Sequence, residues 1–547
     1  MKSYYLSFIF LSFFVNCSVK EKDESIKSPT EDIESFFDLN FTKSERDSMQ
    51  EDLEQNKEYY QKLHSYKLEN AIPPAIMFNP IPVGFKWNKT QELVNFGLKN
   101  QVTLPENRDE LAFYPVADLA VLIKSRKITS MELTQLYLNR LKKYGDTLQC
   151  IIVITEELAL SQAKKADEEI AAGQYRGPLH GIPYGIKDLL TLDGYNTTWG
   201  AAPFKDQKLE GTATVVKNLE EAGAVLVAKL TMGALAMGDV WYGGVTKNPW
   251  NLEQGSSGSS AGSASATVAG LVGFSIGTET LGSIVSPSTR CGASGLRPSY
   301  GRVSRTGAMA LSWSMDKIGP ICRTALDCAL VFNAIYGPDE IDQTLYDFPF
   351  NFDATKDVTK LKVGYLKDYF ENSRNKENDE KSLEAIRALG IEPIAVTFPE
   401  DLPISSLRII LVAESAAAFD ELTRSNRDDL LVRQDKGAWP NSFRNSRFIP
   451  AVEYINANRV RYQLIQEMHK IMKEYDVIVT PSFGGSQLLI TNLTGHPCVV
   501  IPNGVNEEGS PTSISFLGNL FEEGKLLELA TAVQNNTDFE DAHPEFK

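Results

Sequence analysis

Histidine is scarce in this chain of 547 residues, which holds only five. The five are scattered and form neither an HExxH motif nor a facing pair, so a histidine-rich metal site is not expected. Their positions are His64, His180, His469, His496 and His543. We expect the protein to use neither a metal nor a cofactor.

Paired cysteines are also missing. The chain has six cysteines and no CxxC motif. Cys17 stands alone near the N-terminus, and the other five are an odd number without regular spacing, so a complete disulfide framework is not expected. We predict that these five are buried thiols that pack as small apolar side chains: Cys150, Cys291, Cys322, Cys328 and Cys498.

An excess of positive charge is absent as well. Lys and Arg number 55 and Asp and Glu 71, which gives a formal charge of −16 and a pI near 5.0. Proteins that bind nucleic acid rely on basic groups that contact phosphates, so no nucleic-acid partner is expected. Apolar residues make up 42% and charged residues 23%, which is ordinary globular composition and excludes a wholly disordered or fibrous chain.

The apolar run at the N-terminus, from Tyr4 to Val15, is too short to cross a membrane as a helix. It follows Lys2 and is typical of the apolar core of a secretory signal. Phe14 to Cys17 resembles a lipobox, although Asn16 stands where a small residue is usual. We therefore predict a lipoprotein-type signal peptide over 1–16 and lipidation of Cys17, with an ordinary signal peptide as the alternative.

The residues that follow predict a tether and an extension. Residues 17–40 are polar and form no core of their own, as expected for a solvated tether behind a lipid anchor. This places the protein outside the cytoplasm, in the periplasm or on the outer membrane. Residues 41–112 form an extension, in which Ser44–Leu68 has helical spacing and Pro73-Pro74 ends the pattern.

Regular alternation of strands and helices begins at Phe113 and favours one large domain over 113–547. Thr129 and Glu132 form a capping box at the start of a helix that we expect Gly145 to end. Further helices are expected over 156–172, 211–221 and 379–389, and strands over 151–154, 225–228, 361–365 and 476–479. The pattern predicts an α/β fold with a central mixed sheet covered by helices on both faces.

Two segments rich in small residues stand in the middle of this domain, over Gly255–Ser265 and Gly277–Ile284. Gly/Ser composition alone is typical of flexible linkers. Here the apolar stretch Thr267–Ile276 lies between them, and we expect it to form one buried helix. The two segments are then structured loops, in which glycine permits close approach of backbones.

A third motif, Gly181–Asp188 with the sequence GIPYGIKD, lies upstream. The three motifs, in this order, resemble the amidase signature family, and the resemblance runs from about residue 113 to 533. It continues through four downstream segments: Cys291–Ser304, Met315–Pro320, Thr491–Pro497 and Phe516–Gly518. The resemblance implies that the chain is an amidase with this family's α/β fold.

The resemblance also implies a Ser–Ser–Lys triad. The nucleophile is the serine that ends the second motif, Ser283, and the base is Lys187. Two serine pairs fit the first motif, and the Ala-Gly-Ser-Ala that follows selects the second, so the bridging serine is Ser259. In the family this serine follows a cis peptide bond, here Gly258–Ser259. The oxyanion hole is implied to be the backbone N–H groups of Thr280, Leu281, Gly282 and Ser283.

These residue types suit acyl transfer. A serine hydroxyl is a weak nucleophile until a base removes its proton, and a lysine becomes such a base when burial lowers its pKa. The sequence departs from the family pattern at Glu279, Leu281 and Val285, where Asp, Gly and Arg are usual. The triad is unaffected, and the departures put the acyl specificity in doubt.

The resulting prediction is hydrolysis of small-molecule carboxylic amides through a Ser283 acyl-enzyme. Three alternatives remain. Gly258–Gly262 also fits GxSxG, the motif of an α/β-hydrolase with Ser260 as nucleophile and His496 as base, but residues 251–255 are not expected to form the strand that this motif needs. The A subunit of a glutamyl-tRNA amidotransferase shares the fold and triad. A non-catalytic binding protein on the same scaffold is the third.

Three further positions near the motifs receive weaker predictions. We expect Asp188 to be structural and His180 to pack a loop. Trp241 and Tyr242 fit a substrate entrance and core packing equally well. The sequence does not set an oligomeric state.

Overall fold

The computed structural model describes residues 31–65 and 67–545. Two compact units divide the chain, Met1–Glu69 and Asn70–Lys547. The predicted signal peptide and its lipidation site Cys17 lie outside the described residues. In the part that the structure describes, no helix combines the length and apolar character needed to cross a membrane.

The first unit contains helices α1 (Glu31–Phe36) and α2 (Lys43–Ser65). A salt bridge of 2.8 Å between Arg46 and Glu34 joins them. No residue of α2 is buried. The prediction of a helix within 44–68 is confirmed, and the helix ends at Ser65.

The second unit is built on a sheet of eleven strands in the order β1-β3-β2-β8-β10-β9-β14-β15-β13-β11-β12. The pairs β2–β3, β2–β8, β11–β12 and β11–β13 are parallel and the others antiparallel, so the sheet is mixed. The strands are β1 (Ile151–Ile154), β2 (Pro183–Lys187), β3 (Val225–Leu230), β8 (Phe274–Glu279), β9 (Ser294–Arg297), β10 (Lys317–Cys322), β11 (Val363–Leu366), β12 (Ile394–Val396), β13 (Val477–Pro481), β14 (Cys498–Val505) and β15 (Pro511–Gly518).

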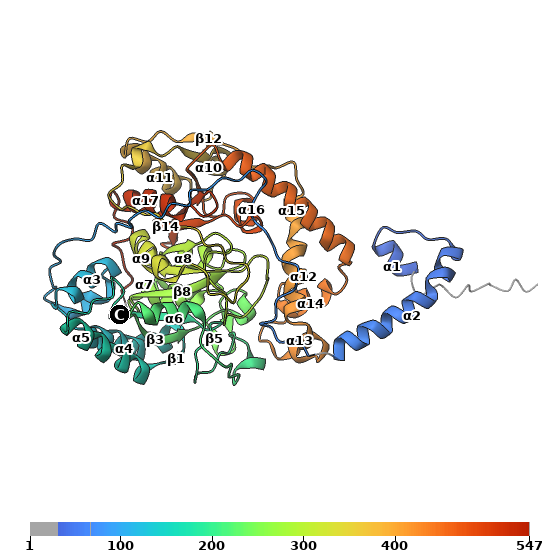
Figure 1. Cartoon of the computed structure of the whole chain (residues 1–547), viewed down its shortest axis with the longest axis horizontal. Coiled ribbons are helices and arrows are strands. Elements are labelled where there is room, and N and C mark those ends of the chain that lie inside the picture. The colour runs from blue at the N-terminus through green and yellow to red at the C-terminus, as the bar shows by residue number, and fades with distance from the viewer. Residues whose placement is uncertain (1–30, 66, 546–547) are drawn as a thin grey trace, which may run out of the picture. The chain divides into compact units, whose positions relative to one another are not determined.

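Helices of very different length surround this sheet (Figure 1). They are α3 (Val116–Lys124), α4 (Ser130–Leu148), α5 (Glu156–Ala171), α6 (Thr214–Glu221), α7 (Ala261–Val268), α8 (Val285–Cys291), α9 (Ala325–Ile335), α10 (Lys367–Glu371), α11 (Lys376–Ala388), α12 (Arg408–Ala418), α13 (Asp420–Arg424), α14 (Trp439–Ser446), α15 (Ala451–Met472), α16 (Gln487–Thr494) and α17 (Glu523–Gln534). Two short ladders lie outside the main sheet: β4 (Val240–Trp241) with β5 (Gly244–Val245), and β6 (Lys247–Asn248) with β7 (Asn251–Gly255).

Successive side chains of a strand point to opposite faces of a sheet, and this alternation places the predicted base. On β2, Tyr184 and Ile186 belong to the large core that also contains α9 and α17. Lys187, one residue on, points to the other face, where α7 packs against β2 and β8. The cores of that second face include residues of α7, α15 and α16. The α/β fold with a mixed sheet covered on both faces is therefore confirmed.

Residues 70–112 are part of the second unit and pack against the rest of it without forming an α-helix. The Asn70 side-chain amide donates to the Ala310 carbonyl at 2.9 Å. Asn95 N–H donates to the Phe352 carbonyl at 2.9 Å and continues as a parallel bridge with Asp353. The five cysteines of this unit are free and buried, as predicted.

The predicted end of the helix that follows Thr129 is wrong, because packing overrides the local signal. The capping box of Thr129 and Glu132 is present, but Gly145 does not end that helix, which runs to Leu148 and ends with Gln149 in the left-handed conformation. Gly145 serves packing instead, because a Cβ there would lie 2.1 Å from Ile151 Cδ1.

The stretch Thr267–Ile276 is likewise not one buried helix. Helix α7 ends at Val268, and β8 begins at Phe274. Gly270, with φ +67°, lies in the turn between them. Both elements are buried on all sides, so their apolar residues carry no period that separates helix from strand.

The expectation that residues 251–255 form no strand is also wrong. They form β7, which pairs with β6 in a two-stranded ladder and is exposed over its first three residues. This ladder lies outside the central sheet. A missing strand therefore no longer argues against the α/β-hydrolase alternative. The contacts of its proposed nucleophile and base, Ser260 and His496, test it instead.

Candidate active site

Lys187, the last residue of β2, is completely buried on the α7 face of the sheet. Its Nζ lies 2.8 Å from Ser259 Oγ, 3.1 Å from Ser260 Oγ and 2.9 Å from Thr278 Oγ1. Burial lowers the pKa of Lys187 from 10.5 to about 7, although the charges of Asp316 and Glu279 oppose this shift. An appreciable fraction of this amine is therefore neutral near pH 7 and able to accept a proton.

Ser259 is completely buried in the loop between β7 and α7. The peptide bond between Gly258 and Ser259 is cis, as the family resemblance implies. Gly258 is needed for close approach of two backbones, because a Cβ there would lie 1.9 Å from the Gly238 carbonyl oxygen. Ser260 ties the loop to β8, since its hydroxyl lies 3.1 Å from both the carbonyl oxygen and the backbone nitrogen of Thr278.

Ser283 lies in the turn between β8 and α8 and is only 8% exposed. The backbone N–H of Ser260 donates to its carbonyl oxygen at 3.2 Å, which joins the two serine-rich loops. Within residues 67–545, the backbone N–H groups of Leu281, Gly282 and Ser283 donate to no protein acceptor. Gly282 has φ +82°, a conformation that favours glycine. The turn thus offers unpaired donors next to the Ser283 hydroxyl.

A buried carboxylate fixes this turn. Glu279, at the end of β8, accepts from the backbone N–H groups of Ile284 at 2.9 Å and Val285 at 3.0 Å. Its other oxygen accepts from Arg297 and Asn492, each at 2.8 Å. Burial opposes the charge of Glu279, but Arg297 and these donors outweigh it and lower the pKa to about 2. The unusual Glu of the second motif is therefore an ionised anchor for the loop that carries Ser283.

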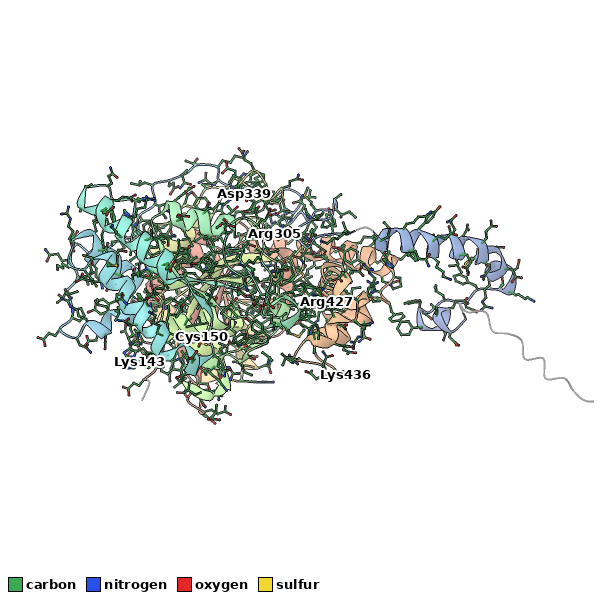
Figure 2. All side chains as sticks on the ribbon, turned by 90° about the horizontal axis from the view of Figure 1, so that it is seen from below. Lys143, Cys150, Arg305, Asp339, Arg427 and Lys436 are labelled. Carbon is green, nitrogen blue, oxygen red and sulfur yellow. The ribbon has the colours of Figure 1, made fainter. Side chains whose placement is uncertain are left out.

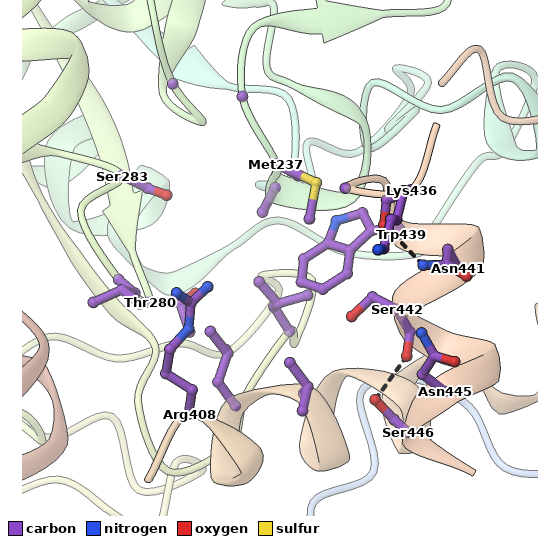
Figure 3. Close-up of a pocket in the computed structure, with 18 of the residues that line it drawn as sticks. Met237, Thr280, Ser283, Arg408, Lys436, Trp439, Asn441, Ser442, Asn445 and Ser446 are labelled. Carbon is purple, nitrogen blue, oxygen red and sulfur yellow. Dashed lines mark hydrogen bonds between the residues drawn. The ribbon is translucent and has the colours of Figure 1, made fainter. Parts of the chain in front are cut away.

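Ser283 opens into a pocket of about 580 Å³ (Figure 3). The helices α12 and α14, which pack against each other, supply much of its wall. Its lining is apolar in the middle and polar along α14, and comprises Ala236, Met237, Gly238, Gly258, Thr280, Leu281, Ser283, Leu311, Arg408, Leu411, Val412, Lys436, Gly437, Trp439, Asn441, Ser442, Asn445, Ser446 and Ile449. A mostly apolar cavity with a few polar groups is the usual form of a small-molecule site.

A family model described as Amidase matches residues 132–490, well over half of the chain. The chain belongs to the amidase family. The A subunit of the glutamyl-tRNA(Gln) amidotransferase from Coxiella burnetii is 32% identical to it over 480 residues, which cover 79% of this chain and 99% of that protein. The similarity thus extends over nearly the full length of this relative.

Solved amidase structures agree with this assignment. The native peptide amidase from Stenotrophomonas maltophilia is 27% identical, with a TM-score of 0.71 over 80% of this chain and 99% of that one. An amidase family protein from Bacillus anthracis is 26% identical, with a TM-score of 0.72 over 80% of this chain and 94% of that one.

The residues of the α/β-hydrolase alternative do not come together in this amidase. His496 Nδ1 lies 2.7 Å from Thr494 Oγ1. Burial lowers the pKa of His496 to about 3. Ser260 instead contacts Lys187 and Thr278, so no histidine–serine pair is formed there.

The weaker predictions have mixed outcomes. Asp188 is structural: it forms a fully buried ion pair of 3.0 Å with Lys229. His180 is buried in a loop, with its Nε2 3.2 Å from Glu169. Trp241 and Tyr242 pack on each other as a T-shaped pair and do not line the pocket described above.

Several residues of the site carry no signal in the sequence. Thr278 lies inside the second motif, but only the fold shows that its hydroxyl meets Lys187. Arg408 and Trp439 come from a part of the chain without a recognisable motif. They follow Ser283 by more than a hundred positions in the sequence, and only the folded structure shows that they line the same pocket.

Proposed function

We propose that this protein is an amidase that hydrolyses small-molecule carboxylic amides through an acyl-enzyme on Ser283. The observation that carries the proposal is the contact of 2.8 Å between Lys187 Nζ and Ser259 Oγ, one residue after Gly258, which lines the same pocket as Ser283. A buried amine with a pKa near 7 beside a serine hydroxyl is suited to proton transfer at neutral pH.

In the proposed mechanism, neutral Lys187 takes a proton from Ser259, and Ser259 takes one from Ser283. The Ser283 oxygen attacks the amide carbonyl carbon, and the oxyanion is stabilised by backbone N–H groups of Thr280, Leu281, Gly282 and Ser283. As the C–N bond breaks, the relay returns the proton to the departing nitrogen, which leaves as ammonia or an amine. Water then attacks the ester and gives a proton to the same relay, which returns it to the Ser283 oxygen as the ester bond breaks and the acid leaves.

The test is release of ammonia or amine from simple amides by three forms of the protein. Ser283→Ala should lower turnover by at least about a thousandfold, because it removes the attacking atom. The matched control is Ser286→Ala, which removes a hydroxyl that contacts Ser257 Oγ at 2.7 Å and takes no part in the relay. Activity that survives Ser283→Ala would contradict the proposal, as would no turnover of any amide by the unchanged protein.

A second candidate function is that of a glutaminase subunit. It is favoured by the 32% identity to amidotransferase A subunits over almost their full length. It requires hydrolysis of L-glutamine to glutamate and ammonia. Turnover of L-glutamine in preference to all other amides would support it over the first proposal.

We further propose that the enzyme is exported and held at a membrane by a lipid on Cys17. The support is the apolar run that ends at Cys17 and the polar stretch that follows it. The mass of protein extracted from membranes should fit a lipidated chain that begins at Cys17, and Cys17→Ser should remain soluble after cell fractionation. A soluble mature wild-type chain that lacks Cys17 would contradict this.

A further inference from the structure

The pocket beside Ser283 has an unusual charge for this chain. Its lining includes two cationic side chains, Arg408 and Lys436, and no acidic one. The chain as a whole carries a net charge of −16. The negative net charge repels anions from the protein as a whole. The two cations of the pocket attract an anionic group to this one place.

Neither cation is neutralised by the protein. Among residues 31–65 and 67–545, no acceptor or carboxylate contacts the guanidinium of Arg408 or the ammonium of Lys436, whereas Arg433, Arg444 and Arg447 each pair with an aspartate. The nearby acids are engaged elsewhere: Glu414, on the same helix as Arg408, accepts from Ser312 and Ser314. Asp435, next to Lys436 in the chain, pairs with Arg433 at 3.0 Å.

Arg408 is the cation that faces the reactive serine. It is the first residue of α12, and its side chain points toward Thr280 and Ser283 in Figure 3. Lys436 lies on the other side of the pocket beside Trp439 (Figure 3), and this exposed residue lies at the edge of the molecule in the view of Figure 2. A group bound by Arg408 would thus belong to the same small molecule whose amide reaches Ser283.

We propose that the substrate is an amide that carries a carboxylate and no ammonium group, with Arg408 as the residue that binds the carboxylate. This rests on the proposed amidase function and names its substrate class. The planar guanidinium fork matches both oxygens of a carboxylate. An ammonium group would find no acidic side chain in the lining and would meet the two cations, so a half-amide of a dicarboxylic acid fits better than L-glutamine.

The experiment measures binding to the Ser283→Ala variant by isothermal titration calorimetry, so that it does not depend on turnover. The ligands are three half-amides, succinamate, glutaramate and adipamate, together with L-glutamine. Each half-amide is compared with a neutral amide of the same length in which a methyl ketone replaces the carboxylate. At least one half-amide should bind about tenfold more tightly than its methyl ketone, a modest effect because Arg408 is exposed to solvent. Glutaramate should bind more tightly than L-glutamine, which differs from it by the ammonium group.

Further substitutions in the Ser283→Ala background test whether Arg408 causes the preference for a carboxylate. Arg408→Gln should abolish the preference for the carboxylate, and Arg408→Lys should keep part of it, because the charge stays and the fork is lost. Arg459→Gln is the matched control, since Arg459 is an exposed arginine that contacts Asn456 on α15, and it should keep the preference.

Four results would overturn the proposal: no half-amide is preferred, the preference survives Arg408→Gln, it is lost only in Lys436→Gln, or L-glutamine binds as tightly as glutaramate. If the unchanged enzyme turns over no amide but the binding preference is present, the amidase function fails while the carboxylate site stands.

Discussion

Lys187 offers the most informative perturbation, because its burial links catalysis to pH. Its pKa of about 7 lies 3.5 units below the ordinary value of 10.5. At about 1.4 kcal/mol per unit, burial disfavours the protonated form by roughly 5 kcal/mol. An ordinary lysine would be neutral in only about one molecule in three thousand at pH 7, whereas about half of the Lys187 side chains are neutral there.

The rate of an amidase that uses this base should follow the same titration. We expect kcat/KM to rise about tenfold per pH unit below pH 7 and to level off above about pH 8. Lys187→Met keeps the apolar stem, removes the base and should lower turnover by about two to four orders of magnitude. His496→Gln should retain the wild-type profile, because His496 already stays neutral above about pH 3.

The same shift makes a prediction about stability. Between pH 7 and 10.5 the unfolded chain binds a proton at Lys187 that the folded chain does not, so stability rises with pH in this window. From pH 7.5 to 9.5, wild type should gain about 2–3 kcal/mol of unfolding free energy relative to Lys187→Met. Urea unfolding followed by circular dichroism measures the difference. A folded Lys187→Met variant with near wild-type turnover, or an equal pH dependence of stability in both proteins, would refute the reasoning.

Three other changes test the relay, the loop anchor and the packing. Ser259→Ala should fold and lose at least about a hundredfold in kcat, since it interrupts the proton relay; near-normal kcat would remove Ser259 from the mechanism. Glu279→Gln leaves Arg297 as an unpaired buried cation and should cost about 3–5 kcal/mol in urea unfolding; an unchanged midpoint would contradict the anchor. Gly145→Ala should cost about 1–3 kcal/mol, because its Cβ meets Ile151 at 2.1 Å; a stabilised variant would show that this contact is not tight.

Elements with a local signal could be predicted from the sequence. The capping box of Thr129 and Glu132 requires only neighbouring residues, and it is present as expected. Gly145 shows the opposite case, because its role is set by Ile151 across a turn and not by the residues beside it. The strand Phe274–Glu279 gave no usable period because both of its faces are buried.

The candidate site divides in the same way. Lys187, Ser259 and Ser283 stand in motifs with a recognisable order, and the structure places Lys187 in contact with Ser259. The pocket wall comes from residues such as Arg408 and Trp439, whose position depends on how α12 and α14 pack in the folded chain. No spacing rule links such residues to a motif more than a hundred positions earlier, so the substrate-binding wall was not predictable.

Covalent labelling by a fluorophosphonate, followed by peptide mass spectrometry, identifies the nucleophilic serine. We expect a single adduct on Ser283 in the wild-type protein and none in Ser283→Ala. Labelling should be slower in Lys187→Met, because the base that activates the hydroxyl is gone. An adduct on Ser260, or the absence of any adduct on a folded protein, would contradict the Ser–Ser–Lys assignment.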